Sequence, residues 1–322
     1  MRRCFAALAA FTFSIAVAWP QVSASAPAIS QLKLGRDCYS RGEMNSAIAH
    51  YDAALRADNG FAEAYYERAR AYYAKGNLQD AFADYGRAIE HDPGFAEAYN
   101  NRGVIAKSAG DQEQAIEEFG KAIRLQPNFA EAYNNRGNAR REKGDLPGAI
   151  DDFNHALRAS PRRAEIYTNR ALARLLKGDR EGAIKDCNKA IKLDPSLAAA
   201  YNNRGVVWEA KGQSEPALRD YSKAIALDPH LIDAYRNRAG VRESRREFRN
   251  AISDYDRVIE IRPDSATSYA NRGILLMMEG EKDAAQRDFD SCLRLSPALK
   301  PELERRLLEI SVRSGSASSS CP

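Results

Sequence analysis

The sequence predicts an all-α protein, a solenoid built from helix pairs, and three regularities in its 322 residues lead to that fold class. Proline recurs every 34 residues. Small and aromatic residues recur at fixed places of the same interval, and these places follow helical spacing. The prolines are Pro93, Pro127, Pro161, Pro195, Pro229, Pro263 and Pro297. This interval defines eight consecutive units without a gap: 28–61, 62–95, 96–129, 130–163, 164–197, 198–231, 232–265 and 266–299.

The composition already narrows the function. Lysine and arginine total 48 against 44 acidic residues, which gives a net charge of +4. This balance argues against a dedicated nucleic-acid binder, and we expect no nucleic-acid partner. Charged residues make up 29% of the chain and hydrophobic residues 44%, as in soluble folded proteins. The chain has one apolar run, at its N-terminus, so a membrane protein with several spans is excluded.

Residues 1–24 are predicted to be a signal peptide of bacterial type. Arg2 and Arg3 give a basic start, residues 5–19 are uncharged, and small residues precede a cleavage site after Ala24. The uncharged run is shorter than the roughly 20 residues of a membrane span. We therefore expect an exported protein, periplasmic or secreted, with no stable membrane span after cleavage. An uncleaved N-terminal anchor is the alternative.

An exported protein can form disulfides, but the cysteine positions argue against them. Cys38, Cys187 and Cys292 fall in three different units, too far apart to approach within bonding distance. Each replaces an apolar or small residue of the other units, so we expect buried thiols. The role of Cys321, near the C-terminus, stays open.

Each unit is predicted to be two antiparallel helices joined by a tight turn. Counting the first residue of a unit as place 1, tyrosine recurs at place 4, a small residue at place 8, alanine at place 20 and an aromatic residue at place 24. Places 4, 8 and 11 lie on one helical face, and so do places 20, 24 and 27. Glycine at place 15 supplies the left-handed residue that ends the first helix. Small residues at places 8 and 20 let the two backbones approach closely.

This pattern resembles the tetratricopeptide repeat over 272 of 322 residues. The resemblance implies a right-handed superhelix in which the first helices line a concave groove. One unit cannot bury its own apolar face, so stability comes from stacking on neighbours. Three departures are local: Gln31 stands where tyrosine recurs, Asn59 where proline recurs, and Arg246 where glycine recurs. The last of these puts the turn of the seventh unit in question.

A capping helix is predicted over residues 300–313. Leu299, Leu303, Leu307 and Ile310 recur every three or four residues, so they would cover the last unit's apolar face. The remaining residues, 314–322, are rich in serine and are predicted to be disordered.

Place 6 carries asparagine in six consecutive units, a set called the asparagine row below. Asparagine is a poor residue for a helix interior, so its recurrence calls for a reason. A primary amide offers a donor and an acceptor side by side, which matches the N–H and C=O of a peptide backbone. We expect the row to bind an extended peptide; amides that serve only the structure are the alternative. The residues are Asn101, Asn135, Asn169, Asn203, Asn237 and Asn271.

Arginine at place 7 and an acid at place 23 occur together in seven units, and the first unit lacks both. This joint occurrence predicts an ion pair between the two helices of each unit, which would fix their register. Ligand binding by the arginines is the alternative. The predicted pairs are Arg68–Asp84, Arg102–Glu118, Arg136–Asp152, Arg170–Asp186, Arg204–Asp220, Arg238–Asp254 and Arg272–Asp288.

Other polar places are less regular. Place 5, which varies, is expected on the exposed side of the first helices, beside the acids at place 2. Residues at place 5 are Tyr66, Asn100, Asn134, Thr168, Asn202, Arg236 and Ala270, and acids at place 2 are Glu63, Glu97, Glu131, Glu165 and Asp233. A basic patch is expected on the seventh unit as a solvated face or a contact for an anionic partner: Arg242, Arg245, Arg246 and Arg249. The lysine and asparagine set that chaperone-binding relatives use to hold a peptide carboxylate is missing.

No catalytic, cofactor-binding or metal-binding residues are predicted, and we expect no enzyme. The four histidines fall in four different units without the spacing of a zinc site or a nucleophile pair. The functional prediction is therefore a peptide- or protein-binding scaffold whose groove holds an extended segment through the asparagine row. A subunit of a cell-envelope assembly, or a self-associating scaffold that binds no free peptide, is the alternative. The sequence leaves the oligomeric state and the partner's identity open.

Overall fold

A computed structural model describes residues 24–318, with side chains up to Glu309. Within this range the chain forms seventeen α-helices and one short 3-10 helix, and no strand. This result confirms the predicted all-α solenoid of repeated helix pairs. The predicted signal peptide, residues 1–24, lies outside the described residues except for Ala24. Among the helices of residues 24–318, none combines the length and apolar content needed to cross a membrane.

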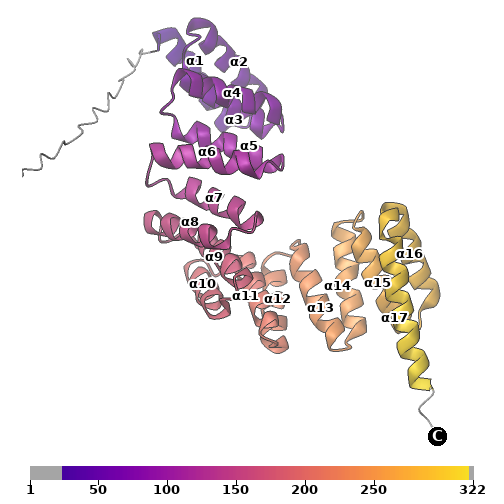
Figure 1. The fold of residues 1–322 in the computed structure, drawn as a ribbon. Coiled ribbons are helices and arrows are strands. Elements are labelled where there is room, and N and C mark those ends of the chain that lie inside the picture. The colour runs from indigo at the N-terminus through magenta and orange to yellow at the C-terminus, as the bar shows by residue number, and fades with distance from the viewer. Residues whose placement is uncertain (1–23, 319–322) are drawn as a thin grey trace, which may run out of the picture. The chain divides into compact units, whose positions relative to one another are not determined.

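The chain folds into two compact parts, although the sequence predicts one uninterrupted array. The N-terminal part ends at Ala98 and the C-terminal part begins at Tyr99, a boundary inside α5 (Ala96–Ser108). The N-terminal part holds α1 (Ala26–Ser40), α2 (Met44–Ala57), α3 (Ala62–Ala74) and α4 (Leu78–His91) (Figure 1).

The C-terminal part continues the alternation of first and second helices after α5. Its further helices are α6 (Gln112–Leu125), α7 (Ala130–Glu142), α8 (Leu146–Ala159), α9 (Ala164–Leu176), α10 (Arg180–Leu193), α11 (Ala198–Ala210), α12 (Ser214–Leu227), α13 (Ile232–Ser244), α14 (Phe248–Ile261), α15 (Ala266–Met278), α16 (Lys282–Leu295) and α17 (Lys300–Ser318), with η1 (Pro297–Leu299) before α17.

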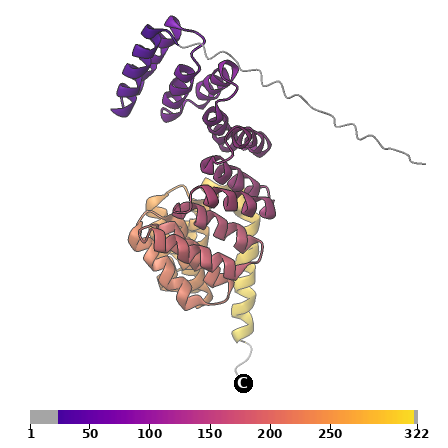
Figure 2. The same ribbon diagram turned by 90° about the vertical axis from the view of Figure 1, so that its left-hand side faces the viewer.

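Within each part, helices pack in three ways. The two helices of a unit pair with each other, as α7 and α8 do, and each second helix packs on the first helix of the next unit, as α8 does on α9 (Figure 1). The pairs also remain side by side in the view turned by 90° (Figure 2). First helices of neighbouring units also touch: α7 contacts α9, and α9 contacts α11. These contacts bring place 5 and place 6 of successive units together.

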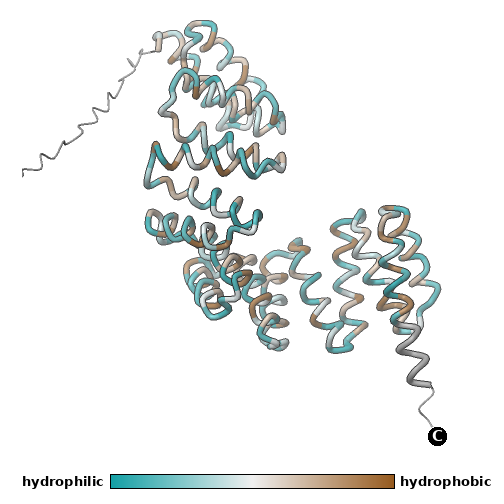
Figure 3. Tube along the Cα trace, in the orientation of Figure 1, coloured by the Kyte–Doolittle hydropathy of each residue, from teal (hydrophilic) through white to brown (hydrophobic). Residues whose placement is uncertain are grey.

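Small residues at place 8 allow each pair to close. A Cβ added at Gly137 would lie 2.8 Å from the Phe153 ring, and one at Gly205 would lie 2.6 Å from the Tyr221 ring. Both rings are fully buried, as are the alanines at place 20. Apolar and polar segments alternate along the helices, as expected for elements with one buried face (Figure 3). The aromatic ring at place 24 therefore occupies the space that the missing side chain leaves.

The turn between the two helices keeps its geometry even without glycine. Gly178 has φ 91°, and the glycines at the same place of the other units also have positive φ. In the seventh unit Arg246 adopts φ 60° and donates its backbone N–H to the Glu243 carbonyl, 2.9 Å away. Gly212 makes the equivalent bond to Glu209 at 2.8 Å. The surrounding helices thus impose the left-handed conformation on a residue that disfavours it.

The helix after the last unit packs as predicted but is longer. Leu303 is buried, and Leu299 and Leu307 pack beside it against α15 and α16. The side chain of Ile310 lies outside the described residues. The helix continues to Ser318, so residues 314–318 of the predicted disordered tail are helical. No proline follows Pro301 before Ser318, and each residue added to an existing helix gains a hydrogen bond.

Three cysteines are buried and free: Cys38, Cys187 and Cys292. Burial raises the pKa of the Cys187 thiol to about 12, so this group stays protonated at neutral pH. Their surroundings are those of small apolar residues, as the sequence predicts. Cys4 and Cys321 lie outside the described residues.

Candidate binding surface on the first helices

The asparagine row lies on six successive first helices, α5, α7, α9, α11, α13 and α15. Each of its side chains is partly exposed, and none is fully buried. Place 6 therefore lies at the border between the packed interior and the surface. An amide in this position can contact a neighbouring helix and solvent at the same time.

Three amides of the row bond to the place-5 asparagine of the unit before them. Asn135 Nδ2 donates to Asn100 Oδ1, and Asn169 Nδ2 donates to Asn134 Oδ1, both at 3.0 Å. Asn237 repeats the bond at 3.0 Å with the place-5 asparagine of its preceding unit, Asn202. Each bond joins place 6 to place 5 of the preceding unit. The row thus ties neighbouring first helices together.

The expectation that place 5 lies on the exposed side is wrong. Asn100 is only 1% exposed, and Thr168, Asn202 and Ala270 are also buried. Adjacent first helices approach closely enough to enclose this place, and a buried amide there needs a partner. The place-6 amide of the next unit supplies it. Place 2 behaves as expected, since Glu131, Glu165 and Asp233 are exposed.

The six amides are not equivalent. Among the described residues, no hydrogen bond reaches Oδ1 of Asn135, Asn169 or Asn237. By contrast, Asn101 Oδ1 accepts from Asn100 at 3.2 Å, and Asn203 Oδ1 accepts from Asn202 at 3.4 Å. Asn271 Oδ1 accepts from Arg306 at 2.8 Å. Three amides therefore keep a free oxygen and a second N–H while their orientation is already fixed.

All seven predicted arginine–acid pairs are brought together within their own units. In each, the guanidinium Nη2 donates to the carboxylate over 2.6–2.9 Å, and Nε donates to the same group. The acids are only 1–7% exposed. The guanidinium carbon, Cζ, of each arginine also lies 5.5–5.7 Å from the ring centroid of the place-4 tyrosine in its unit. These arginines are held on two sides by their own unit.

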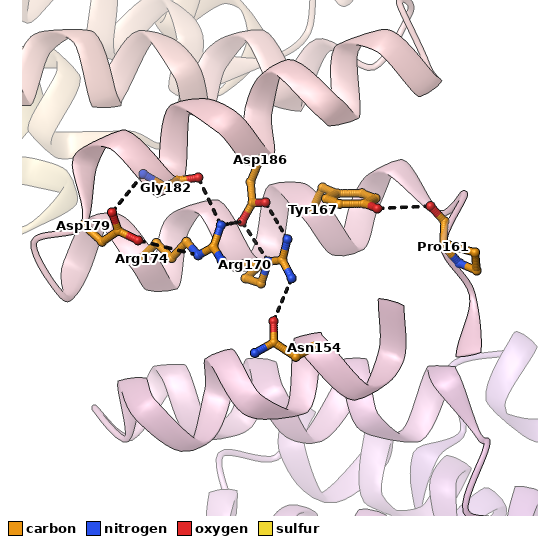
Figure 4. A network of polar contacts seen from close by, with 8 residues as sticks. All are labelled: Asn154, Pro161, Tyr167, Arg170, Arg174, Asp179, Gly182 and Asp186. Atoms are coloured by element: carbon orange, nitrogen blue, oxygen red, sulfur yellow. Dashed lines mark hydrogen bonds and ion pairs between the residues drawn. The ribbon is translucent and has the colours of Figure 1, made fainter. Parts of the chain in front are cut away.

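A further partner of the arginines was missed from the sequence. In five of the seven units the third nitrogen, Nη1, donates to place 25 of the preceding unit's second helix. The acceptors are Asp52, Asn154, Asn188, Ser222 and Asp256, at 2.6–3.0 Å. Figure 4 shows Arg170 between Asp186 of α10 and Asn154 of α8. The sequence contains a signal for this contact. Place 25 is polar in these units, whereas glycine, Gly120, occupies it in the unit before Arg136.

A second arginine, at place 11, reaches the same acid in three units. Arg140 bonds to Asp152 at 3.0 Å, Arg174 to Asp186 at 2.8 Å, and Arg242 to Asp254 at 2.7 Å. Arg174 also donates to the backbone oxygen of Gly182 at 3.2 Å (Figure 4). Each carboxylate in these units thus compensates two guanidinium groups.

The basic patch predicted on the seventh unit is mostly neutralised. Arg242 bonds to Asp254, Arg245 to Glu215 and Glu247, and Arg249 to Glu279. Two of these acids lie on neighbouring units, which explains why one unit's sequence suggested unpaired charge. This surface therefore offers little net positive charge to an anionic partner.

Three of the four histidines contact residues of the framework. His50 bonds to Gln31 at 2.8 Å, while His91 and His155 stack on Tyr65 and Tyr133. Within the part of the chain that the structure describes, no group of three histidine, cysteine or acidic side chains has an arrangement that could hold a metal ion.

Solved structures with the same fold include three proteins of different lengths. A tetratricopeptide repeat protein from Parabacteroides merdae has a TM-score of 0.66 and 17% identity, covering 78% of this chain and all of its own. The APC/C hetero-tetramer Cut9–Hcn1 has a TM-score of 0.62 and 15% identity. The match covers 86% of this chain and 55% of that one. Pseudomonas aeruginosa pilF has a TM-score of 0.54 and 22% identity. The match covers 63% of this chain and 92% of that one. At these identities the likeness shows the fold alone.

Family models give the assignment. No match was found among curated proteins. A model described as TPR repeat matches residues 35–76, 69–108, 105–140 and 137–178. A second, described as tetratricopeptide repeat, matches residues 164–197 and 198–231. Together these matches span more than half of the chain, and the helix pairs, small residues and turns described above agree with them. The chain belongs to the tetratricopeptide repeat family.

Proposed function

We propose that this protein is a non-enzymatic scaffold that binds an extended peptide segment by its main chain. Tetratricopeptide repeat proteins generally act as protein-interaction scaffolds, which sets the class. The asparagine row supplies the specific contact. The observation that carries the proposal is the free oxygen and second N–H of Asn135, Asn169 and Asn237, which the preceding unit already orients.

The fixed orientation favours binding. A free asparagine loses rotamer entropy when a ligand immobilises it, whereas these amides are held before the ligand arrives. A primary amide can then pair with both the N–H and the C=O of a peptide. Because these hydrogen bonds involve only the peptide main chain, the asparagine row would bind peptides of many different sequences. Exposed place-2 acids near it, such as Glu131 and Glu165, would modulate the choice.

The test begins with peptides selected from a random displayed library on the full chain. We expect Asn135→Ala combined with Asn169→Ala to lower the affinity for a selected peptide by about tenfold or more, since two hydrogen bonds to the peptide are lost. Fluorescence anisotropy of the labelled peptide measures the affinity. Methylation of the peptide's backbone nitrogens should weaken binding as well. A peptide that tolerates both changes would contradict main-chain capture.

A matched control separates binding from structure. Asn100→Ala combined with Asn134→Ala removes the same two inter-unit hydrogen bonds from the acceptor side but leaves the amides of Asn135 and Asn169 in place. We expect the two double variants to lose similar thermal stability, while the first loses much more affinity. Equal losses of affinity would favour amides that serve only the structure.

We also propose that the protein works outside the cytoplasm, in the periplasm or after secretion. The basic start at Arg2 and Arg3, followed by the uncharged residues 5–19, supports this. Mass spectrometry of the protein from its native compartment should give an N-terminus at Ser25. A full-length mass in the cytoplasmic fraction would contradict export.

A further inference from the structure

The N-terminal part differs from the asparagine row at the equivalent place. In the second unit place 6 is Glu67, and its side chain is only 7% exposed. Its Oε1 accepts from Arg36 Nε at 2.9 Å and its Oε2 accepts from Arg70 Nη1 at 2.8 Å. One buried carboxylate therefore fixes two guanidinium groups from successive first helices, α1 and α3.

These two arginines are exposed, unlike those at place 7. The side chains of Arg36 and Arg70 are 44% and 39% exposed, whereas Arg68 is 15% exposed. Both occupy place 9, where the other units carry no charge. The Arg70 guanidinium lies 4.9 Å from the centroid of the Tyr39 ring, which holds its plane. The pair is thus positioned and faces solvent.

Donors on both arginines remain available. Among the described residues, no acceptor bonds to Arg70 Nε or Nη2, or to Arg36 Nη1. Arg36 Nη2 donates to Glu63 at 2.5 Å. Glu63 is 46% exposed, so this bond is a surface ion pair of small stability that a competing anion can displace at little cost. Glu67 stays in place because both of its oxygens are bonded.

One buried hydroxyl of the N-terminal part also has no hydrogen-bond partner among the described residues. This hydroxyl is the Oη of Tyr51, which is fully buried. Burial raises the pKa of this phenol, and the Glu67 carboxylate raises it further, while Arg36 and Arg70 oppose the rise. The hydroxyl is therefore an unused donor within electrostatic range of the two arginines and their carboxylate.

We propose that Arg36, Arg70 and Tyr39 form a binding site for an oxyanion on a polypeptide, either the carboxylate of an acidic side chain or the phosphate of a phosphorylated one. Two guanidinium groups against one buried carboxylate leave one positive charge, for which Glu63 is the resting counter-ion. Planar guanidinium forks suit both anions, because each can accept two hydrogen bonds. This site is in the N-terminal part and does not depend on the asparagine row.

The test uses the full chain with arginine side chains labelled with ¹⁵N. Three capped tripeptides serve as probes, with glutamate, phosphoserine or glutamine between two glycines. We expect saturable shifts of the Arg36 and Arg70 Nε–H resonances with the first two and none with the glutamine peptide. A stronger effect of phosphoserine would assign the site to phosphate, a stronger effect of glutamate would assign it to carboxylates, and equal effects would show that it accepts either anion. Absence of shifts, or equal shifts with glutamine, would overturn the proposal.

Variants localise the effect. Arg70→Gln should lower the affinity for the glutamate peptide by about tenfold, as expected for a lost charge-assisted hydrogen bond. Arg87→Gln is the matched control, because it removes the same charge from an exposed arginine of α4 that bonds to Asp84. It should leave the affinity unchanged. Glu63→Gln removes the competing anion without touching the buried cluster and should strengthen binding. If Arg87→Gln weakens binding as much as Arg70→Gln, or if Glu63→Gln weakens it, the site is wrong.

Discussion

The N-terminal and C-terminal parts share one framework and differ in the first-helix surface built on it. Both use an arginine at place 7, bonded to a buried acid at place 23 and stacked on a tyrosine at place 4. At place 6 the C-terminal part has amides, while the N-terminal part has Glu67 held by two arginines. The comparison shows that places 4, 7, 8, 20, 23 and 24 keep the helix pairs alike, whereas places 5, 6 and 9 differ between the two parts.

The first and largest prediction concerns the shared framework. Asp186→Ala would leave Arg170 and Arg174 without their buried partner, and Asp84→Ala would do the same to Arg68 and Arg87. We expect each variant to lower the free energy of unfolding by about 3 kcal/mol, as for a broken buried pair. Urea unfolding followed by circular dichroism measures it. A large loss in one part and none in the other would show that the framework is not shared.

The second prediction exchanges the surfaces. Glu67→Asn places the amide of the C-terminal part into the N-terminal part. The neutral amide bonds less strongly to Arg36 and Arg70, so we expect a loss of about 1–2 kcal/mol in the free energy of unfolding. The loss is limited because both arginines are partly exposed and can turn to water. The same urea measurement checks this. No loss would mean that Glu67 does not hold the two arginines.

The third prediction fills a gap in the framework. Arg136 has no place-25 partner in the preceding unit, where Gly120 stands, and a Cβ added there would lie 3.6 Å from Arg136 Nη1. Gly120→Asp should therefore stabilise the chain by about 0.5–1 kcal/mol through a new charge-assisted hydrogen bond and better helix propensity. Gly120→Ala is the control, because alanine has the higher propensity but no acceptor. If alanine is clearly the more stable variant, the added bond contributes nothing.

The repeat length and the buried places predicted the fold well, because burial restricts them strongly. The seven arginine–acid pairs could be read from joint occurrence, since one unit, with Leu34 and His50, lacks both partners. The partner of the asparagine row could not, because place 5 changes from asparagine to threonine, arginine and alanine along the chain. The burial of place 5 depends on how closely neighbouring first helices approach each other. The sequence of a single unit does not determine that distance. The division at Ala98 likewise leaves the 34-residue interval unchanged.

The central claim is that three oriented amides contact the main chain of a bound peptide. The most direct measurement follows the side-chain Nδ2–H resonances of the asparagine row while a selected peptide is titrated into the full chain. The account predicts that Asn135, Asn169 and Asn237 shift together and become protected from hydrogen exchange, with smaller changes at Asn101, Asn203 and Asn271. Tight binding that leaves the first three resonances unmoved would contradict it.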